Sequence, residues 1–309
     1  MHHFSRGGTF NRRAQRVGRG SDHADPAARS DSCERHVQRP PTGIRGAFLV
    51  GTSGWSYDWE RFYPTALASR DRLAFYARCF RSVEVNYSFY HLPRPGTYEK
   101  WLSQTPQGFV FALKLSRFIT HVRRLEQART ALQTFLSSAA ALAQKLGPVL
   151  VQLPPTLRAD AGVLRAFLQD AHCVAKALSM QDRLRLAFEF RHSSWFESAA
   201  VLKELETFDA ALVLAHSRRY PYPTLEPLTA RWVYLRFHGP KALFASRYGT
   251  QGLAPWVLKI RRWLRQGRDV YGYFNNDVHG YAVDDARALL ELVAARAGRA
   301  RRPVLRPSA

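Results

Sequence analysis

The chain has 309 residues, 46% of them hydrophobic, and a formal net charge of +22 at pH 7. This apolar content is enough for a sizeable core and excludes a wholly disordered protein. No apolar run approaches the roughly 18 residues of a membrane-spanning helix, and residues 1–45 lack the apolar segment of a secretory signal, so we expect neither membrane insertion nor export.

Much of the charge lies near the two ends of the sequence. Residues 1–45 carry a net charge of +5 and residues 296–309 another +5, which leaves +12 on the middle of the chain. We expect residues 1–45 and 297–309 to be disordered basic extensions of a folded domain, residues 46–296. The excess in that domain is mostly arginine, whose planar guanidinium suits carboxylate and phosphate.

Cysteine usage indicates a reducing compartment. Cys33, Cys79 and Cys173 are odd in number and widely spaced, with no CxxC arrangement. This spacing predicts neither a disulfide framework nor a zinc site. We therefore expect a cytoplasmic protein.

Strand-like apolar runs alternate with helix-like segments from residue 47 onward. The expected strands cover residues 47–53, 82–88, 109–116, 148–154, 184–191, 211–217, 232–239 and 269–276. The expected helices cover residues 66–80, 96–104, 126–146, 160–177, 196–208, 254–266 and 282–298. This rhythm over about 250 residues predicts a TIM-like (β/α)8 barrel. A doubly wound open sheet is the alternative, but no GxGxxG follows the first strand.

Polar residues gather near the ends of the expected strands. Strand side chains point alternately into the barrel and toward the helices. In "SVEVNYS" this alternation turns Glu84 and Asn86 inward and Tyr87 outward, and in "LRLAFEFR" it turns Glu189 and Arg191 inward. The whole candidate set is Ser53, Glu84, Asn86, Lys114, Gln152, Glu189, Arg191, His216, Arg236, His238 and Asn275. Barrel active sites lie at this carboxyl end of the strands.

Burying this many charges requires partners. An unpaired buried carboxylate costs on the order of several kcal/mol, so the charges must pair with one another or face a ligand. Ion pairs that merely neutralise each other, Glu84–Lys114 and Glu189–Arg191, are one interpretation. We favour a ligand-directed site, because folding alone gives little reason for so many buried charges.

Seven blocks of the sequence resemble those of a known family. In order they are "VGTSGWSYDWERFYP", "VEVNYSFYHLP", "FVFALKLSRFITH", "LGPVLVQLPP", "FEFRHSSW", "RFHGP" and "YGYFNND". Residues 47–295 thereby resemble the DUF72 family, also called YecE-like. The resemblance implies a TIM-like barrel and a cytoplasmic protein, with no established activity. It implies a characteristic polar set of Ser53, Gly54, Trp55, Glu84, Asn86, Lys114, Glu189, Arg191, His238, Asn275 and Asn276.

One position departs from the family pattern. His216 stands where members usually carry an aspartate, so any role of that aspartate passes to histidine or is lost. Together with His238, Glu84 and Glu189 it could surround a divalent metal. No HxH, HxxxH or HxD spacing supports this arrangement, and we predict no metal and no cofactor.

The turn after the first strand offers further candidate contacts. In "GTSGWSY" the backbone N–H groups of Gly51, Ser53 and Gly54 are candidates for an anion cradle, with a simple tight turn as the alternative. Trp55 and Tyr57 either stack on a ligand or plug the barrel mouth.

Two later segments complete the candidate site. Asn275 and Asn276 suit the hydroxyl or phosphate oxygens of a ligand, although Asn276 also suits a helix cap. The segment "KALFASRYGTQG", residues 241–252, is a candidate lid.

We expect an enzyme of the hydrolase, lyase or isomerase type that acts on a small anionic or polyhydroxylated substrate, phosphorylated or sugar-like. Glu84 and Glu189 are its predicted acid/base pair. Lys114 is expected to pair with Glu84 or with a ligand oxyanion, or to form a Schiff base if desolvated beside other cations. The alternatives are a nucleic-acid-binding barrel, resembling a metal-dependent phosphodiesterase, that uses its basic core and tails, and a binding module without catalysis.

Overall fold

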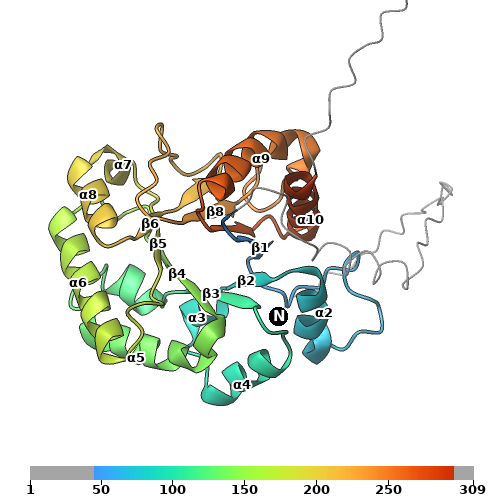
Figure 1. Cartoon of the computed structure of the whole chain (residues 1–309), viewed down its shortest axis with the longest axis horizontal. Coiled ribbons are helices and arrows are strands. Elements are labelled where there is room, and N and C mark those ends of the chain that lie inside the picture. Colours follow the sequence, from blue (N-terminus) through green and yellow to red (C-terminus); the bar gives the residue numbers. More distant parts are fainter. Residues whose placement is uncertain (1–44, 296–309) are drawn as a thin grey trace, which may run out of the picture.

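Strands and helices alternate along residues 45–295, the part of the chain that the computed structural model describes (Figure 1). The predicted extensions, residues 1–45 and 297–309, lie outside the described residues except for Arg45. Within the described part, no helix combines the length and the apolarity needed to cross a membrane.

The strands form a closed parallel barrel. They are β1 (Phe48–Thr52), β2 (Ser82–Val85), β3 (Val110–Lys114), β4 (Leu146–Gln152), β5 (Leu186–Glu189), β6 (Ala211–Leu212), β7 (Leu214–His216), β8 (Val233–Phe237) and β9 (Val270–Phe274). Parallel pairing gives the orders β1-β9-β8-β7 and β2-β3-β4-β5-β6. A bridge between Ser53 and Glu84 joins β1 to β2. Val213 lies between β6 and β7 and donates to the Phe188 carbonyl at 2.9 Å, so these two segments act as one interrupted strand. The predicted (β/α)8 barrel is confirmed.

Helices surround the ring of strands (Figure 1). The longer ones are α2 (Arg72–Cys79), α4 (Pro95–Ser103), α5 (Arg129–Ala139), α6 (Ala161–Ala177), α8 (Ala199–Thr207), α9 (Gly249–Arg265) and α10 (Tyr281–Ala294). The short ones are η1 (Ser69–Asp71), α3 (Tyr87–Tyr90), η2 (Phe118–Val122), η3 (Ala140–Lys145) and α7 (Ser194–Glu197). Tyr87 was predicted to face the helices, but β2 ends at Val85, and Tyr87 starts α3 with 51% of its surface exposed.

Several predicted helix boundaries are wrong, and the helix predicted over 66–80 starts only at Arg72. The helix predicted over 126–146 is regular only over α5, because Ala143 in the following turn adopts a positive φ of 49°. The helix predicted over 254–266 starts earlier, at Gly249, so the candidate lid 241–252 ends in the first turn of α9. The buried carboxylate of Asp285 in α10 accepts the Gly249 N–H at 3.0 Å, and this long-range contact holds the start of α9.

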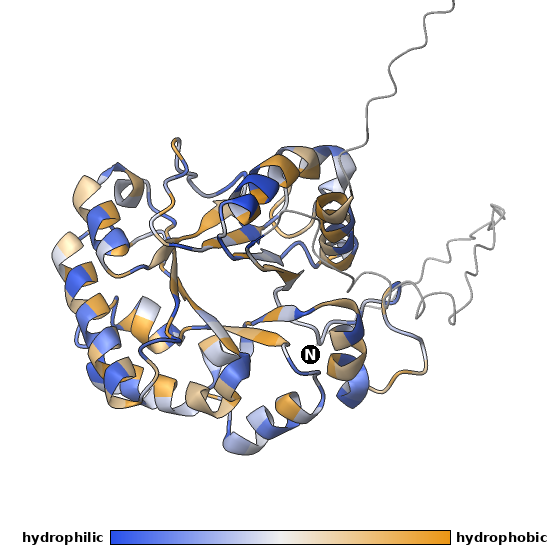
Figure 2. Ribbon diagram, in the orientation of Figure 1, coloured by the Kyte–Doolittle hydropathy of each residue, from blue (hydrophilic) through white to orange (hydrophobic). Residues whose placement is uncertain are grey.

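Alternation of the strand side chains produces two apolar clusters. One cluster lies between the strands and the helices, and it contains the predicted outward residues Val83, Val85, Phe111, Leu113, Leu186, Phe188, Val233 and Leu235. The other fills the barrel interior, where small side chains share the space with aromatic ones: Ala112, Ala187, Ala211, Ala215, Trp232, Tyr234, Tyr271 and Tyr273. Figure 2 shows hydrophobic residues along the strands. Because these apolar side chains fill the barrel interior, the polar side chains lie at the carboxyl ends of the strands.

Gly51 on β1 should tolerate no side chain. A Cβ there would lie 2.0 Å from the Ser82 carbonyl oxygen of β2, whereas a Cβ at Gly96 in α4 would have no neighbour within 4 Å. We expect Gly51→Ala to lower the free energy of unfolding by about 3 kcal/mol through overpacking. Gly96→Ala should raise it by up to about 1 kcal/mol, because alanine favours the helix. Urea unfolding of both variants checks this, and equal shifts would contradict the strand packing.

Candidate functional site

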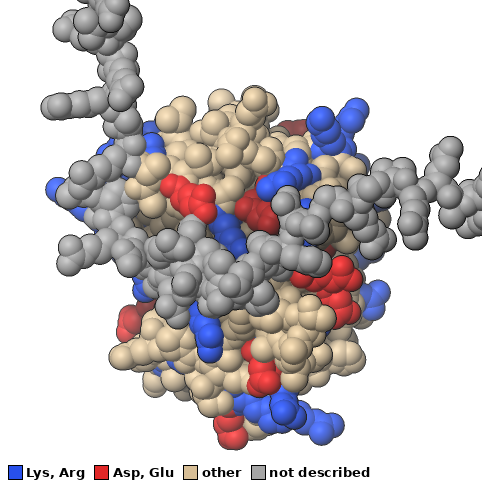
Figure 3. Space-filling view, turned by 90° about the vertical axis from the view of Figure 1, so that its right-hand side faces the viewer, with Lys and Arg blue, Asp and Glu red and all other residues tan. Residues whose placement is uncertain are grey.

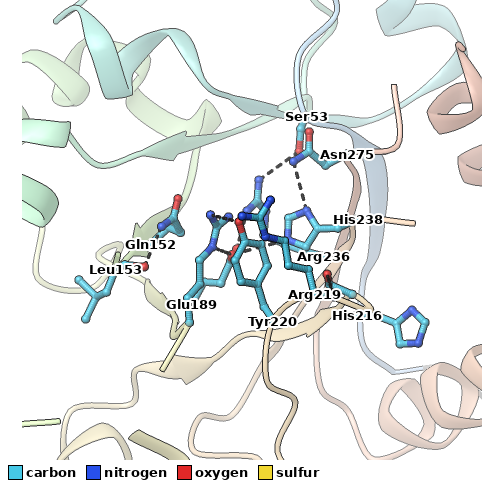
Figure 4. Close-up of polar contacts among 12 residues, drawn as sticks. Ser53, Gln152, Leu153, Glu189, His216, Arg219, Tyr220, Arg236, His238 and Asn275 are labelled. Atoms are coloured by element: carbon cyan, nitrogen blue, oxygen red, sulfur yellow. Dashed lines mark hydrogen bonds and ion pairs between the residues drawn. The ribbon is translucent and has the colours of Figure 1, made fainter. Parts of the chain in front are cut away.

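Arg236 lies at the centre of a buried charge cluster (Figure 4). Its side chain on β8 is 1% exposed, and its Nη2 donates to Oε1 of Glu84 at 2.7 Å. Its Nη1 donates to Oε2 of Glu189. Glu84 is the penultimate residue of β2, and Glu189 is the last residue of β5. Both carboxylates are buried. One guanidinium therefore bridges two carboxylates across the barrel interior.

The remaining oxygen sites of Glu84 are also occupied. Ser53 Oγ donates to Oε1 at 2.5 Å, and the Tyr234 hydroxyl donates to Oε2 at 2.7 Å. Burial raises the pKa of the Tyr234 phenol well above its ordinary value, which keeps this donor protonated. Tyr234 is absent from the predicted site, although it shares the inward parity of Arg236 two residues later on β8.

Glu189 is held in its ionised form. Burial raises the pKa of its carboxyl, but the guanidinium groups of Arg236 and Arg191 outweigh burial and hold the pKa well below its usual range. Arg191 Nε donates to Oε1 at 2.8 Å, so the predicted Glu189–Arg191 ion pair is present. Because both carboxylates bind Arg236, the geometry argues against the predicted Glu84–Glu189 acid/base pair.

Lys114 ends β3 beside this cluster and has a different environment. Its Nζ lies 4.1 Å from the centroid of the Phe89 ring. It forms no hydrogen bond or ion pair within the described part of the chain, so the predicted Glu84–Lys114 pair is not formed. Burial, together with the charges of Arg236 and Arg191, lowers the pKa of its amine to about 7 against the opposing pull of Glu189. The amine is therefore about half neutral at pH 7.

Two further residues border Lys114 and Arg191. The Arg191 guanidinium stacks over the Tyr220 ring at 4.2 Å, and its Nη1 donates to the Tyr220 hydroxyl at 3.2 Å. His121 in η2 is half-buried, and burial together with the charge of Lys114 lowers its pKa to about 4. Both residues lie outside the expected strands, so the alternation of strand side chains could not predict that they belong to the site.

His238 is a buried neutral imidazole at the same end of the barrel, and its Nε2 has no hydrogen-bond partner within residues 45–295. Burial lowers the pKa of its imidazole. The Asn275 amide nitrogen lies 3.2 Å from Nδ1, and because that nitrogen only donates, Nδ1 accepts and Nε2 carries the proton. Nε2 lies 3.6 Å from Oε1 of Glu189. The predicted inward positions of His238 and Asn275 agree with this arrangement.

The turn after β1 is a tight turn. The Ser53 N–H donates to the Phe274 carbonyl at 2.8 Å, so it is not available for an anion cradle. Gly54 adopts a φ of +102°, which favours glycine. Trp55 packs edge-on against Trp101 at 5.4 Å, which supports its structural interpretation.

Three other predicted residues lie around the mouth in different settings. Tyr57 is 38% exposed and donates from its hydroxyl to the Ser53 carbonyl at 3.2 Å. The Asn86 amide donates to the same carbonyl at 3.4 Å. Gln152 is buried at the end of β4 and donates to the Leu153 carbonyl at 2.8 Å. Of the three, Tyr57 has the most surface available to a ligand.

His216 lies outside the barrel interior, contrary to prediction, and Asn276 also points away from it. Ala215 belongs to the interior cluster, so its neighbour His216 points outward, where Nδ1 lies 2.9 Å from the Tyr248 hydroxyl. Figure 4 shows the His216 ring directed away from the cluster. Asn276 donates to the Asp285 carboxylate at 2.8 Å and is a structural residue. Strict alternation along β7 and β9 would have predicted the outward direction of His216 and Asn276, because Ala215 and Tyr273 point inward.

The outward position of His216 also removes the predicted metal-binding alternative. Across residues 45–295, no group of three or more His, Cys, Asp or Glu side chains is arranged to hold a metal ion. The donors that converge at the mouth are instead guanidinium, ammonium, amide and hydroxyl groups, which suit an anionic or hydroxylated ligand.

Comparison with known proteins gives the family of the chain. The sequence model described as "Protein of unknown function DUF72" matches residues 49–308. The chain belongs to the DUF72 family. This match runs beyond residue 295, where the resemblance was expected to end, into residues outside the described part. The family description names no activity, so the function of this DUF72 protein must be argued from its own site.

Individual DUF72 relatives agree with this assignment. UPF0759 protein YunF of Bacillus subtilis is 27% identical over 278 residues, covering 79% of this chain and 94% of YunF. UPF0759 protein YecE of Escherichia coli K12 is 33% identical over 108 residues, covering 35% of this chain and 38% of YecE. The crystal structure of a DUF72 family protein from Thermotoga maritima covers 80% of this chain and 99% of its own, with a TM-score of 0.68 at 24% identity, and it supports the fold.

The nucleic-acid alternative remains a prediction. It depends on the net charge of +12 in the middle of the sequence. Figure 3 shows acidic and basic side chains interspersed on the face that it draws, outside the area covered by grey residues. A mixed surface of this kind gives a weaker field than a single-sign patch.

Removing the bridging cation should destabilise the barrel. Arg236→Met leaves two buried carboxylates without their shared guanidinium, and we expect a loss of about 3–5 kcal/mol in unfolding free energy at pH 7.5. The orphaned carboxylates should then have raised pKa values, so the loss should shrink as the pH falls toward 5. Urea unfolding at several pH values measures this. Arg231→Met, at a side chain that is 90% exposed, is the control and should change stability by less than about 1 kcal/mol.

Burial of Lys114 should lower the free energy of unfolding at neutral pH. Its pKa of about 7 lies below the ordinary 10.5, so between these values the unfolded chain binds more protons and stability should rise with pH. Lys114→Met removes the penalty and should raise the melting temperature at pH 6.5, by about 2–4 °C for each kcal/mol gained. The gain should shrink toward pH 9.5. Lys241→Met changes an exposed lysine and should have no such effect. No gain at pH 6.5 would mean that the Lys114 ammonium has a partner.

Proposed function

We propose that this DUF72 protein is an enzyme that binds a small anionic or polyhydroxylated substrate at the carboxyl end of its barrel and transfers a proton through Lys114. The observation that carries this proposal is the contrast between saturated and unsaturated charges. Arg236 binds both Glu84 and Glu189 through its two terminal nitrogens, whereas the Lys114 amine has no acceptor within residues 45–295. A group that titrates near pH 7 is suited to accept and return a proton.

The charges around Lys114 favour an anion. Those that influence its pKa are Arg236, Glu189, Arg191 and Glu84. The two guanidinium groups and the two carboxylates cancel, so protonated Lys114 leaves the cluster with one excess positive charge. A bound carboxylate or phosphate would neutralise that charge in a site of low dielectric, where such an interaction is strong.

Other residues would orient the substrate. Arg191 keeps its Nη2 clear of hydrogen bonds within the described chain and can bind an oxyanion while its Nε holds Glu189. Asn275, Asn86 and Tyr57 follow the carboxyl ends of β9, β2 and β1, at the same end of the barrel, and suit hydroxyl groups. In this scheme the two glutamates do not contact the ligand. They hold the guanidinium groups of Arg191 and Arg236, which do.

Calorimetry with inorganic phosphate and a panel of carboxylated and phosphorylated metabolites tests this function. Because anion binding requires the charged amine, affinity for the wild type should fall by up to about tenfold per pH unit above 7. Lys114→Met should weaken binding and remove this pH dependence, whereas Lys176→Met, at an exposed position on α6, should behave as the wild type. Compounds that bind are then followed by NMR for chemical change, which Lys114→Met should abolish. Failure of the whole panel to bind, or an unchanged pH profile in Lys114→Met, would contradict the proposal.

A further inference from the structure

Lys114 differs from every other lysine of the chain. The sequence contains seven lysines among its 46 lysine and arginine residues, and all seven lie in the described part. Four of them are exposed: Lys100, Lys176, Lys203 and Lys241. The ammonium of Lys145 is half-buried but donates to the carbonyls of Leu102 and Thr105 at 2.9 and 2.8 Å, and that of Lys259 pairs with Glu226. Lys114 alone among the seven is half-buried without an oxygen acceptor in residues 45–295.

This environment favours a neutral amine. Burial is the main cause, and the charges of Arg236 and Arg191, which keep their protons, add to it. The flat face of Phe89 shields one side of Nζ from water. The lowered pKa of about 7 agrees with this geometry. A neutral amine among fixed cations is a nucleophile as well as a base.

We propose that Lys114 forms a Schiff base with a small aldehyde or ketone that carries a carboxylate or phosphate, and that Arg191 holds the anionic group. This assignment rests on the proposed function and specifies its substrate class. Lys114 is the last residue of β3 and Arg191 follows the end of β5, and these two strands flank β4, so both side chains lie at the same end of the barrel. The Nη2 of Arg191 is the donor left over after Glu189 and Tyr220 are bound. An electrophilic carbon and an anionic group can therefore meet a nucleophile and a fixed cation at one end of the barrel.

The chemistry is balanced without a redox partner. The lone pair of Nζ attacks the carbonyl carbon, the C=O π electrons move to oxygen, and a proton passes from nitrogen to that oxygen to give a carbinolamine. The C–O bond then breaks, the oxygen takes up one more proton and leaves as water, and a protonated C=N bond remains. The iminium withdraws electrons from the adjacent carbon and so eases loss of a proton or of a C–C bond there.

Reductive trapping tests this assignment on the wild-type chain. Glyoxylate and sodium cyanoborohydride are added at pH 7, and labelled lysines are located by peptide mass spectrometry. Acetaldehyde is the matched two-carbon aldehyde without a carboxylate. Glyoxylate should label Lys114 at least about tenfold faster than Lys241, because an ordinary lysine is neutral in fewer than about one in a thousand molecules at pH 7. It should also label Lys114 faster than acetaldehyde does, and Lys114→Arg should lose the fast adduct.

The outcomes separate this assignment from the proposed function. Labelling of Lys114 no faster than Lys241 overturns the Schiff base, and equal rates for glyoxylate and acetaldehyde overturn the anionic carbonyl class. If phosphate or glyoxylate binds by calorimetry but Lys114 is not labelled selectively, the Schiff base fails and the proposed anion site stands. If neither binding nor selective labelling occurs, both fail.

Discussion

The salt bridge of Arg236 with Glu84 and Glu189 is the constraint on which the carboxyl end of the barrel depends. Its three members come from β8, β2 and β5, so the interaction crosses the interior and links the two groups of strands. Each charge would be costly to bury alone, and each is tolerable only because the others are in place. Ser53, Tyr234 and Arg191 complete the hydrogen bonding of the carboxylates. The resulting network has little freedom to move.

This rigidity determines what is left for chemistry. Below the salt bridge, Tyr234 and Tyr273 pack with ring centroids 5.2 Å apart and close the interior. At the carboxyl ends of the strands, two groups form no hydrogen bond within the described residues: the Lys114 amine and Nη2 of Arg191. The glutamates that look most catalytic in the sequence are both bound to Arg236. The lysine that looks like their counter-ion forms no ion pair within the described residues, because Arg236 pairs with both glutamates.

A second buried carboxylate has a comparable role outside the barrel wall. Asp285 on α10 accepts from the backbone of Tyr248 and Gly249 and from the Asn276 amide. It thus joins the end of β9, the start of α9 and the loop before it. The Ser246 hydroxyl also bonds the backbone of Ala242 within this loop. A lid motion of residues 241–252 would therefore have to break several of these hydrogen bonds.

The sequence alone determined the barrel and most of the inward polar set, because the period of two in a strand links each residue to one face. It placed Glu84, Glu189, Arg236 and His238 correctly for that reason, and it would have turned His216 and Tyr234 correctly had the same rule been applied to them. Only the tertiary structure decided which charges pair. Pairing depends on distances between strands far apart in the chain, and those distances gave Arg236 to both glutamates and left Lys114 without an acceptor within the described residues.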